Sequence, residues 1–172
     1  MDIDTLRKIQ APLKQRYKED PKSAIVPSRA EATVEDDDIA CRVPTFAGTA
    51  VAGLHPAAGG DGSKACSADM LMEALVGCAG VTLKAVATAM RIPLKHAKVI
   101  AEGNWDIRGT LAVDRDAPVG LTDVTLTFEI DSPASPEKRA KLIELTERFC
   151  VVYQTLANPP TLNSRTHFIG KD

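Results

Sequence analysis

The stretch SADMLMEALVGCAGVTLKAVATAMR, residues 67–91, decides the fold. Its 25 residues contain no proline and many strong helix formers, so it predicts one long helix with Ser67 as the N-cap. Pro93 disfavours the helical conformation of Ile92, so the helix should end near Arg91. Small and apolar residues repeat at three- and four-residue steps on two adjacent faces: Leu71, Leu75, Cys78, Thr82, Ala85 and Ala89 on one, and Met70, Ala74, Gly77 and Val81 on the other. A helix that is apolar on most sides must be enclosed, and the few strands predicted elsewhere suggest that a second chain completes the enclosure.

Size and charge exclude several classes of function. The chain has 172 residues, which suits one domain with a real core, and a formal net charge of −2. Charges of both signs are scattered, so neither nucleic acid nor an anionic membrane is indicated as a partner. The chain lacks 18 consecutive apolar residues, and its start, MDIDTLRKIQ, lacks the apolar run of a secretory signal. We therefore expect a soluble, cytoplasmic protein.

The four cysteines do not form a metal-binding pattern. There is no CxxC pair, and the spacing to the three histidines is unlike that of a zinc site, so no metal is expected. In a reducing compartment such cysteines are free or redox-active rather than structural. The glycine-rich segment 55–64 precedes the central helix but lacks the GxxxxGK[ST] spacing of a phosphate-binding loop. No nucleotide site is expected there.

The segments ahead of the central helix predict an extension and three strands. Residues 4–20 predict an amphipathic helix capped by Asp4, which Pro12 should kink or divide. We assign residues 1–28 to this extension and residues 29–172 to the main domain. Three short strands are predicted at 29–34, 39–43 and 49–54, the first two paired as a hairpin across the acidic turn 36–38.

The segments after the central helix predict two long strands, two helices and a last strand. A strand is expected over 98–107, and the alternation of 122–131 is the clearest strand pattern in the chain. Ser135 is the expected cap of a helix that begins with Pro136 and ends at Cys150. A second short helix follows and should stop at Asn158-Pro159-Pro160, and a final strand is predicted at 164–169.

This order of elements resembles the OsmC/Ohr family over residues 29–169. The resemblance is carried by the small-residue helix at 71–82 with Cys78, by MRIPL at 90–94 and by RFCVVYQTL at 148–156. It implies an α+β fold, with mixed and antiparallel sheets wrapped around long central helices in an intertwined homodimer that has two active sites at the subunit interface. It also implies a stress-response antioxidant enzyme, a thiol-dependent peroxidase for organic hydroperoxides. Such enzymes need no bound cofactor and are reduced by external dithiols, for example lipoylated proteins.

The resemblance assigns roles to two of the four cysteines. Cys78 matches the peroxidatic position and Cys150 the resolving position. A thiolate attacks the terminal peroxide oxygen, an alcohol leaves, and the resulting sulfenic acid condenses with a second thiol to form a disulfide. The two residues are 72 positions apart, so only the fold can bring them together. Cys41 and Cys66 have no matched role.

A thiol in an apolar helix needs help to ionise, because desolvation raises its pKa. Family members use an arginine from the N-terminal strands, held by an acidic residue, and here Arg42 is the first candidate and Arg29 the second. The organic-hydroperoxide branch has a Pro-Glu pair just ahead of the central helix. This chain has Ser67-Ala68-Asp69 instead, so Asp69 is the candidate carboxylate, displaced by one position.

A second interpretation needs no catalysis. A cysteine on a buried helix is most often a small hydrophobic residue. The same dimer could then bind a small apolar ligand or a protein partner in its interface cavity, with the cysteines only lining it. The cysteine pair favours the enzyme, whereas the missing Pro-Glu pair favours the binding protein.

Overall fold

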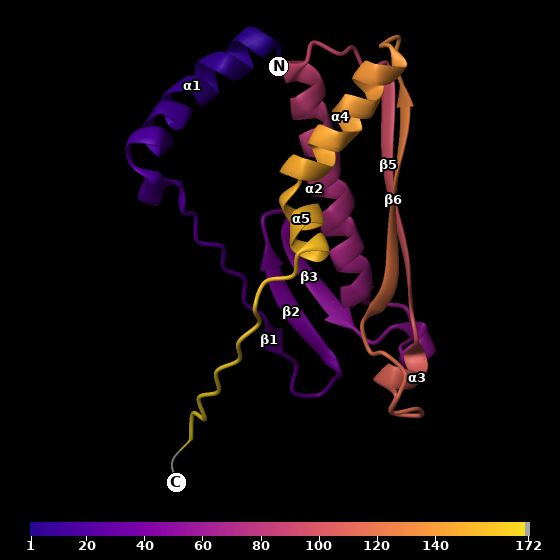
Figure 1. The fold of residues 1–172 in the computed structure, drawn as a ribbon. Helices are drawn as coiled ribbons and strands as arrows, with labels where there is room; N and C mark the ends of the chain where they lie inside the picture. Colours follow the sequence, from indigo (N-terminus) through magenta and orange to yellow (C-terminus); the bar gives the residue numbers. More distant parts are fainter. Residues whose placement is uncertain (171–172) are drawn as a thin grey trace.

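The computed structural model describes residues 1–170 and is organised around one long helix, α2 (Ser67–Ala89). A long β-hairpin runs along one side of α2 and two further helices cover another side (Figure 1). The other elements, in chain order, are α1 (Ile3–Glu19), the 3-10 turn η1 (Pro21–Ala24), β1 (Thr33–Val34), β2 (Ala40–Thr45), β3 (Gly48–Gly53), the 3-10 turn η2 (Pro56–Ala58), β4 (Ala65–Cys66), β5 (His96–Trp105), α3 (Ile107–Thr110), β6 (Leu121–Asp131), α4 (Pro136–Phe149) and α5 (Val151–Ala157). The predicted α+β class is confirmed.

The ends of α2 correct one prediction and explain another. Ser67 is the first helical residue, and the N-cap is Cys66, whose side chain makes no capping hydrogen bond. At the other end, the Ile92 N–H donates to the Ala87 carbonyl over 2.8 Å while Arg91 adopts a left-handed conformation with φ 54°. This is the Schellman arrangement, which usually places glycine where Arg91 stands. The helix therefore ends near Arg91, as the position of Pro93 led us to expect, and a specific hydrogen-bonded cap closes it.

Helix α1 is a single arched helix that begins earlier than predicted (Figure 1). Its N-cap is Asp2 and not Asp4, because the Asp2 carboxylate accepts a hydrogen bond of 2.7 Å from the Thr5 N–H. Pro12 lies inside the helix without dividing it. Proline there removes the N–H that would bond the carbonyl four residues earlier, and such a loss bends a helix more readily than it ends one.

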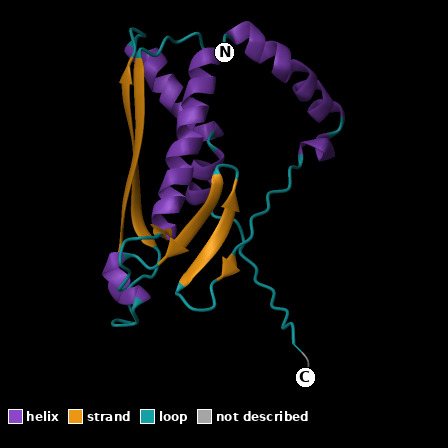
Figure 2. Ribbon diagram, turned by 180° about the vertical axis from the view of Figure 1, so that it is seen from behind, coloured by secondary structure: helices purple, strands orange, loops and turns teal. Residues whose placement is uncertain are grey.

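Two separate sheets flank the helices (Figure 2). The first has the order β1-β2-β3-β4, antiparallel except for the parallel pair β3–β4. The predicted hairpin is present, although β1 is shortened to two residues and does not include Arg29. The second sheet is the antiparallel pair β5–β6, with an irregularity in register at Asn104/Trp105. Strand β5 lies two residues earlier than the predicted 98–107, since Ile107 begins α3, and β6 begins one residue before the predicted 122–131.

The core lies where α2, α4 and β5–β6 meet. Its buried residues are Leu83, Val86, Ala87, Ile92 and Leu142. Ser135 caps α4 as predicted, since its side chain accepts a hydrogen bond from the Lys138 N–H. Burial of these side chains supplies the main stabilisation of the fold, at roughly 1.5–3 kcal/mol for each large one.

The predicted last strand is wrong for this chain. Residues 158–170 follow α5 without regular secondary structure and extend away from the body (Figure 1). Leu162, Phe168 and Ile169 on this segment are fully or almost fully exposed. A strand needs a neighbouring edge to pair with, and the segment meets none here.

Helix α2 is long and apolar enough to cross a membrane by length and composition alone. The core helix of a water-soluble domain passes the same test, and α2 contacts β5, α4 and α5. One part of its surface stays uncovered, because Val81 is 74% exposed.

Candidate active site

The structure brings Cys78 and Cys150 together. Cys78 lies half-buried in the middle of α2, with Thr82 one turn further along the same face. Cys150 is fully buried and stands between two helices, as the C-cap of α4 and the N-cap of α5. The two thiol groups lie close enough that each influences the pKa of the other. The fold thus meets the first requirement of a two-cysteine cycle.

The geometry of Cys150 follows from a break in the helical path. Its backbone is extended, with φ −75° and ψ 110°, so α4 ends and α5 starts in a new direction. The first N–H groups of a helix have no partner within that helix. Here the N–H groups of Val151 and Val152 donate to the Cys78 sulfur, and the Tyr153 N–H donates to Cys150. The start of α5 therefore supplies hydrogen-bond donors to both sulfur atoms.

The Cys78 site favours the thiolate. Burial acts most strongly and raises the pKa of Cys78, but four hydrogen bonds oppose it and together lower the pKa below its ordinary value. The donors are the Val152 N–H, the Cys150 thiol, the Val151 N–H and the Thr82 hydroxyl. Hydrogen bonds to a charged acceptor are stronger than those between neutral groups, so they stabilise the ionised form.

The Cys150 site favours the neutral thiol. Burial is again the largest influence and raises the pKa of Cys150. The Tyr153 N–H opposes this rise, whereas the hydrogen bond to Cys78 and the negative charge of its thiolate add to it. Cys78 therefore loses its proton first, and Cys150 remains a donor beside it.

The two candidate arginines form ion pairs elsewhere in this chain. Arg42 on β2 pairs through its Nε with a carboxylate oxygen of Glu35, which follows β1. Arg29 pairs with Glu31 over 2.6 Å, and both partners are exposed. Burial and the four hydrogen bonds are the influences on the pKa of Cys78, and none of these comes from an arginine. Within one chain, Arg42 has an acidic partner but no contact with the thiol.

Asp69 lies far from Cys78 along α2. Nine residues separate them, which is about 13 Å at 1.5 Å per residue. Asp69 lines an open groove with Glu73, Glu102 and Asp123. Among the ion pairs of residues 1–170, none includes Asp69, so it holds neither candidate arginine in this chain.

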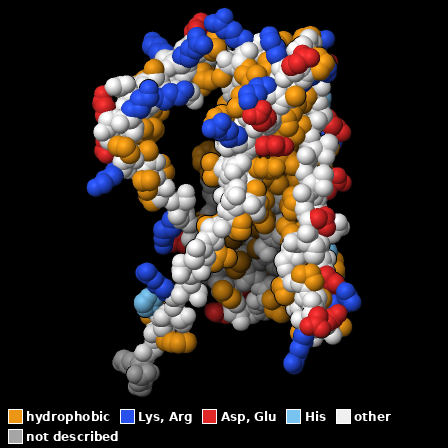
Figure 3. All heavy atoms as spheres, viewed as in Figure 1, with side chains coloured by type: hydrophobic (Ala, Val, Ile, Leu, Met, Phe, Trp, Pro, Cys, Tyr) orange, Lys and Arg blue, Asp and Glu red, His pale blue; other side chains and the backbone are white. Residues whose placement is uncertain are grey.

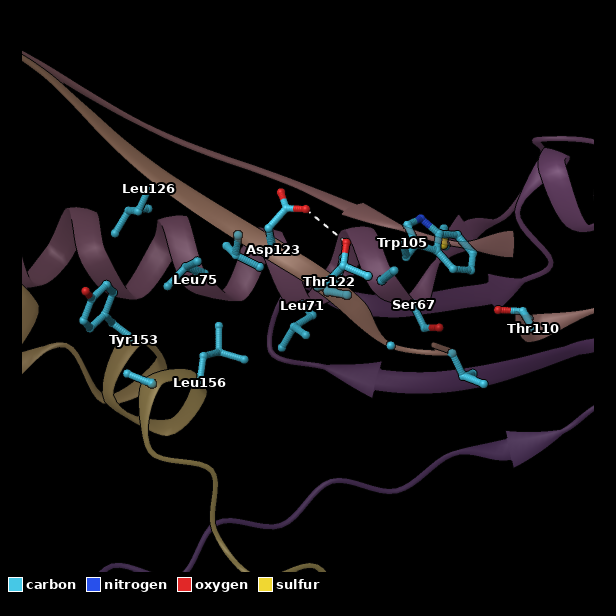
Figure 4. Close-up of a pocket in the computed structure, with 17 residues that line it drawn as sticks. Ser67, Leu71, Leu75, Trp105, Thr110, Thr122, Asp123, Leu126, Tyr153 and Leu156 are labelled. Atoms are coloured by element: carbon cyan, nitrogen blue, oxygen red, sulfur yellow. Dashed lines mark hydrogen bonds between the residues drawn. The ribbon is translucent and has the colours of Figure 1, made fainter. Parts of the chain in front are cut away.

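A largely apolar cavity of about 820 Å³ runs along α2 from Leu75 toward Ser67 (Figure 4), and neither Cys78 nor Cys150 is among the residues that line it. Leu75, one turn before Cys78, and Tyr153, in the first turn of α5, lie at one end together with Leu126. Trp105 lies at the other end, with the His55 ring edge-on to it at 5.6 Å. The cavity could hold the organic part of a molecule whose reactive end meets Cys78. In the part of the chain that the structure describes, no three His, Cys, Asp or Glu side chains are grouped to hold a metal ion.

The family model described as OsmC-like protein matches residues 60–165. This range includes Cys78, Cys150 and all the residues that line the cavity. The chain belongs to the OsmC-like family. The predicted family is therefore confirmed, and the match leaves α1 and β1 to β3 outside it. No curated protein matches the chain.

Solved OsmC-like structures share the fold at low sequence identity. The OsmC-like protein of Mycoplasma pneumoniae has a TM-score of 0.64 and 18% identity, over 78% of this chain and 89% of that one. An organic hydroperoxide resistance protein OsmC from Legionella pneumophila has a TM-score of 0.61 and 14% identity, over 78% and 93%. An organic hydroperoxide resistance protein from Elizabethkingia anophelis has a TM-score of 0.59 and 18% identity, over 77% and 91%. These likenesses establish the fold.

The sequence analysis did not identify the groups that lower the pKa of Cys78. The N–H groups of Val151 and Val152 are backbone atoms, and only the abrupt change of helix at Cys150 makes them available. Thr82 appeared in the sequence as one more small residue of the helix face. Its position four residues after Cys78 was the available signal, because such pairs are neighbours on a helix surface.

Proposed function

We propose that this OsmC-like protein is a thiol peroxidase that reduces organic hydroperoxides. The observation that carries the proposal is that the fold brings Cys78 on α2 together with Cys150 at the α4–α5 junction, and hydrogen bonds there lower the pKa of Cys78. A two-cysteine cycle needs one sulfur that can attack the peroxide as a thiolate and a second sulfur close enough to form a disulfide with it. The solved structures named as organic hydroperoxide resistance proteins support the same chemistry.

In the first step, the Cys78 thiolate attacks the terminal oxygen of the hydroperoxide and the O–O bond breaks. The electron pair leaves with the alkoxide, which takes up a proton to become an alcohol, and Cys78 becomes a sulfenic acid. The Cys150 thiol already donates to the Cys78 sulfur and is a candidate source of that proton. Cys78 is thereby oxidised by two electrons and the peroxide is reduced by two.

In the second step, Cys150 attacks the Cys78 sulfenic acid. A disulfide forms, and the hydroxyl group of the sulfenic acid leaves as water after taking up one proton from solvent, because the Cys150 proton has gone to the alkoxide. An external dithiol, such as a lipoylated protein, then returns both cysteines to thiols by exchange. A cytoplasmic location, where thiols are kept reduced, is part of this proposal.

A homodimer is also part of the proposal, and it gives Arg42 a role. Arg42 is held by Glu35 in the first sheet and has no contact with Cys78 in its own chain. We infer that Arg42 of one copy approaches Cys78 of the other. Glu35 is then the carboxylate that holds the arginine, the role that the sequence suggested for Asp69. An arginine within about 4–6 Å of a thiolate stabilises it by Coulomb attraction.

The alternative function is that of a binding protein for a small apolar ligand. It is favoured by the apolar cavity beside Leu75 and Tyr153 and by the absence of any arginine contribution at Cys78 within the described residues of one chain. In that case the ligand occupies the cavity, and Cys78 and Cys150, which are not among its lining residues, undergo no catalytic cycle.

Thiol counting separates the two functions. The reduced protein has four free cysteines, which are counted after denaturation, before and after one equivalent of cumene hydroperoxide. We expect a loss of two thiols per chain and the release of one equivalent of cumyl alcohol. Cys78→Ser is the matched control and should lose none. Retention of all four thiols by the wild type would refute the peroxidase and favour the binding protein.

A further inference from the structure

Helix α1 has an apolar face that its own chain does not cover. The face is formed by Leu6, Ile9, Leu13 and Tyr17 at helical spacing. None of the residues of α1 is buried, and Ile9 and Leu13 are 50% and 38% exposed. The helix also lies outside the family match at 60–165. The family fold therefore does not explain why these apolar side chains are present.

The uncovered face of α1 opens on the same space as an uncovered face of α2. Only the first turns of α1 approach the body, where Met1 and Leu6 line a small cavity with Val81, Ala85 and Thr88 of α2. Ile9 and Leu13 share their helix face with Leu6, so they point to the same side as α2. A hollow lies between the arch of α1 and the helices of the body, and apolar side chains line it (Figure 3). The two faces together form one concave apolar surface.

The solvent-accessible surface of the chain is much larger than that of a compact monomer, which indicates a large binding partner. Its accessible surface is 13162 Å², whereas a compact monomer of 18.4 kDa exposes about 8,200 Å² by the scaling of surface with mass. The difference is about 5,000 Å² per chain, or about 10,000 Å² for two copies, whereas an obligate dimer interface buries roughly 2,000–5,000 Å² or more summed over both partners, so the excess is ample for such an interface. A small ligand would cover only a minor part of it.

The shape of the surface decides between two kinds of occupant. α1 carries five basic residues and two acidic ones, so its charge suits an anionic lipid surface. However, its apolar face turns inward toward Val81 on α2, and a flat bilayer cannot enter the hollow between two helices. A protein segment can enter it. A second copy also has the same uncovered faces to offer, as a two-fold interface requires.

We infer that α1 is a dimerisation arm that clasps a second copy of this chain, which enters between α1 and α2. The inference rests on the homodimer of the proposed function and goes beyond it, since it assigns the extension to the interface. By two-fold symmetry each copy clasps the other, and Ile9 and Leu13 are buried in both. Removal of these contacts weakens the dimer without changing the fold of either chain.

The test uses a charge-matched pair of full-length variants. Ile9→Asp/Leu13→Asp lowers the net charge by two on the apolar face, and Lys8→Asp lowers it by two on the opposite face of the same helix. Sedimentation equilibrium should show a dimer dissociation constant at least about 100-fold higher for the first variant, since two apolar contacts of roughly 1.5 kcal/mol each are replaced by buried charges. The second variant should stay within threefold of the wild type. Equal dissociation constants for both variants would refute the arm.

Cross-linking of the wild type keeps the test independent of how the variants fold. In a dimer assembled from ¹⁴N and ¹⁵N chains, lysine-specific cross-links from Lys14 on α1 should join light to heavy peptides. Cross-links from Lys14 confined to single chains would refute the arm. Flotation with anionic vesicles that is lost in Ile9→Asp/Leu13→Asp would instead assign the face to a membrane. A monomeric wild type would refute the homodimer itself. A dimer whose dissociation constant is unchanged by the substitutions would refute only the role of α1 as an arm.

Discussion

Cys78, in the middle of α2, lies beside Cys150, at the junction of α4 and α5, and each thiol influences the pKa of the other although they are 72 positions apart in the chain. Two of the groups that lower the pKa of Cys78 are backbone N–H groups of α5, those of Val151 and Val152. The two side-chain groups are the Thr82 hydroxyl and the Cys150 thiol.

Thr82→Val should slow the alkylation of Cys78 by iodoacetamide at pH 7 roughly three- to tenfold, because a hydrogen bond to a charged group contributes about 1.5 kcal/mol. The pKa of Cys78 is lowered in the wild type, so its alkylation rate should reach half its maximum at a pH below that of an ordinary thiol, and Thr82→Val should move this midpoint upward. Thr82→Ser keeps the hydroxyl and is the control. An unchanged profile in Thr82→Val would mean that this hydroxyl does not reach the sulfur.

Cys78→Ser and Cys150→Ser should have different phenotypes. Cys78→Ser should abolish the consumption of cumene hydroperoxide, because the attacking sulfur is gone. Cys150→Ser should complete one attack and then accumulate a sulfenic acid, which dimedone traps and mass spectrometry locates on Cys78. Full turnover in both variants would leave the pair without a catalytic role.

Arg42→Met should slow alkylation of Cys78 at pH 7 at least tenfold, about 1.4 kcal/mol, with Arg42→Lys in between because it keeps the charge and loses the planar fork. Arg29→Met is the matched control, since Arg29 also belongs to an exposed ion pair near β1. An effect of Arg29→Met alone would show that the second candidate is the activating arginine.

Co-expression tests whether Arg42 acts across the dimer. Alone, Arg42→Met is expected to be slowed at least tenfold and Cys78→Ser to be inactive. A mixed dimer has one site with Cys78 from the first chain and Arg42 from the second, so it should recover activity at that site. No recovery in a purified mixed dimer would exclude action of Arg42 on the other copy.

Arg91→Gly should stabilise the protein by about 0.5–1 kcal/mol, because glycine adopts the left-handed conformation of this cap without steric cost. Arg91→Ala removes the side chain and keeps the backbone strain, so it should give no such gain. Urea unfolding measures both variants. A loss of stability in Arg91→Gly would show that the arginine side chain itself supports the end of α2.

The predictable parts of this protein are those that depend on neighbouring residues in the chain. The apolar spacing around Leu75 located α2, and the alternation from Val124 to Ile130 located β6, because both patterns are periodic and local. The strand predicted at 164–169 failed because strands depend on a pairing edge, which local sequence does not describe. Ser67 was taken for the cap because its residue type is favoured there, whereas the chain enters the helix through the short strand β4, which places Cys66 at that position.

The site was predictable only in part. The resemblance to the OsmC/Ohr family selected Cys78 and Cys150 from four cysteines, and the fold places them in contact. The donors on Val151 and Val152 were not predictable, because they depend on the angle between two helices. The ion pair of Arg42 with Glu35 depends on the register of β1 against β2, in which Thr33 and not Glu35 lies opposite Arg42.

The N–H groups that hold the Cys78 sulfur belong to the two residues that directly follow Cys150. Conversion of the two thiols to a disulfide removes the charged acceptor of these groups and ties the start of α5 to α2 through a covalent bond. The amide protons of Val151 and Val152 should then exchange with solvent deuterium faster in the oxidised protein than in the reduced one, while those of the α2 core stay slow. The junction of α4 and α5 would thus report the redox state of the protein through the exchange rates of its amide protons.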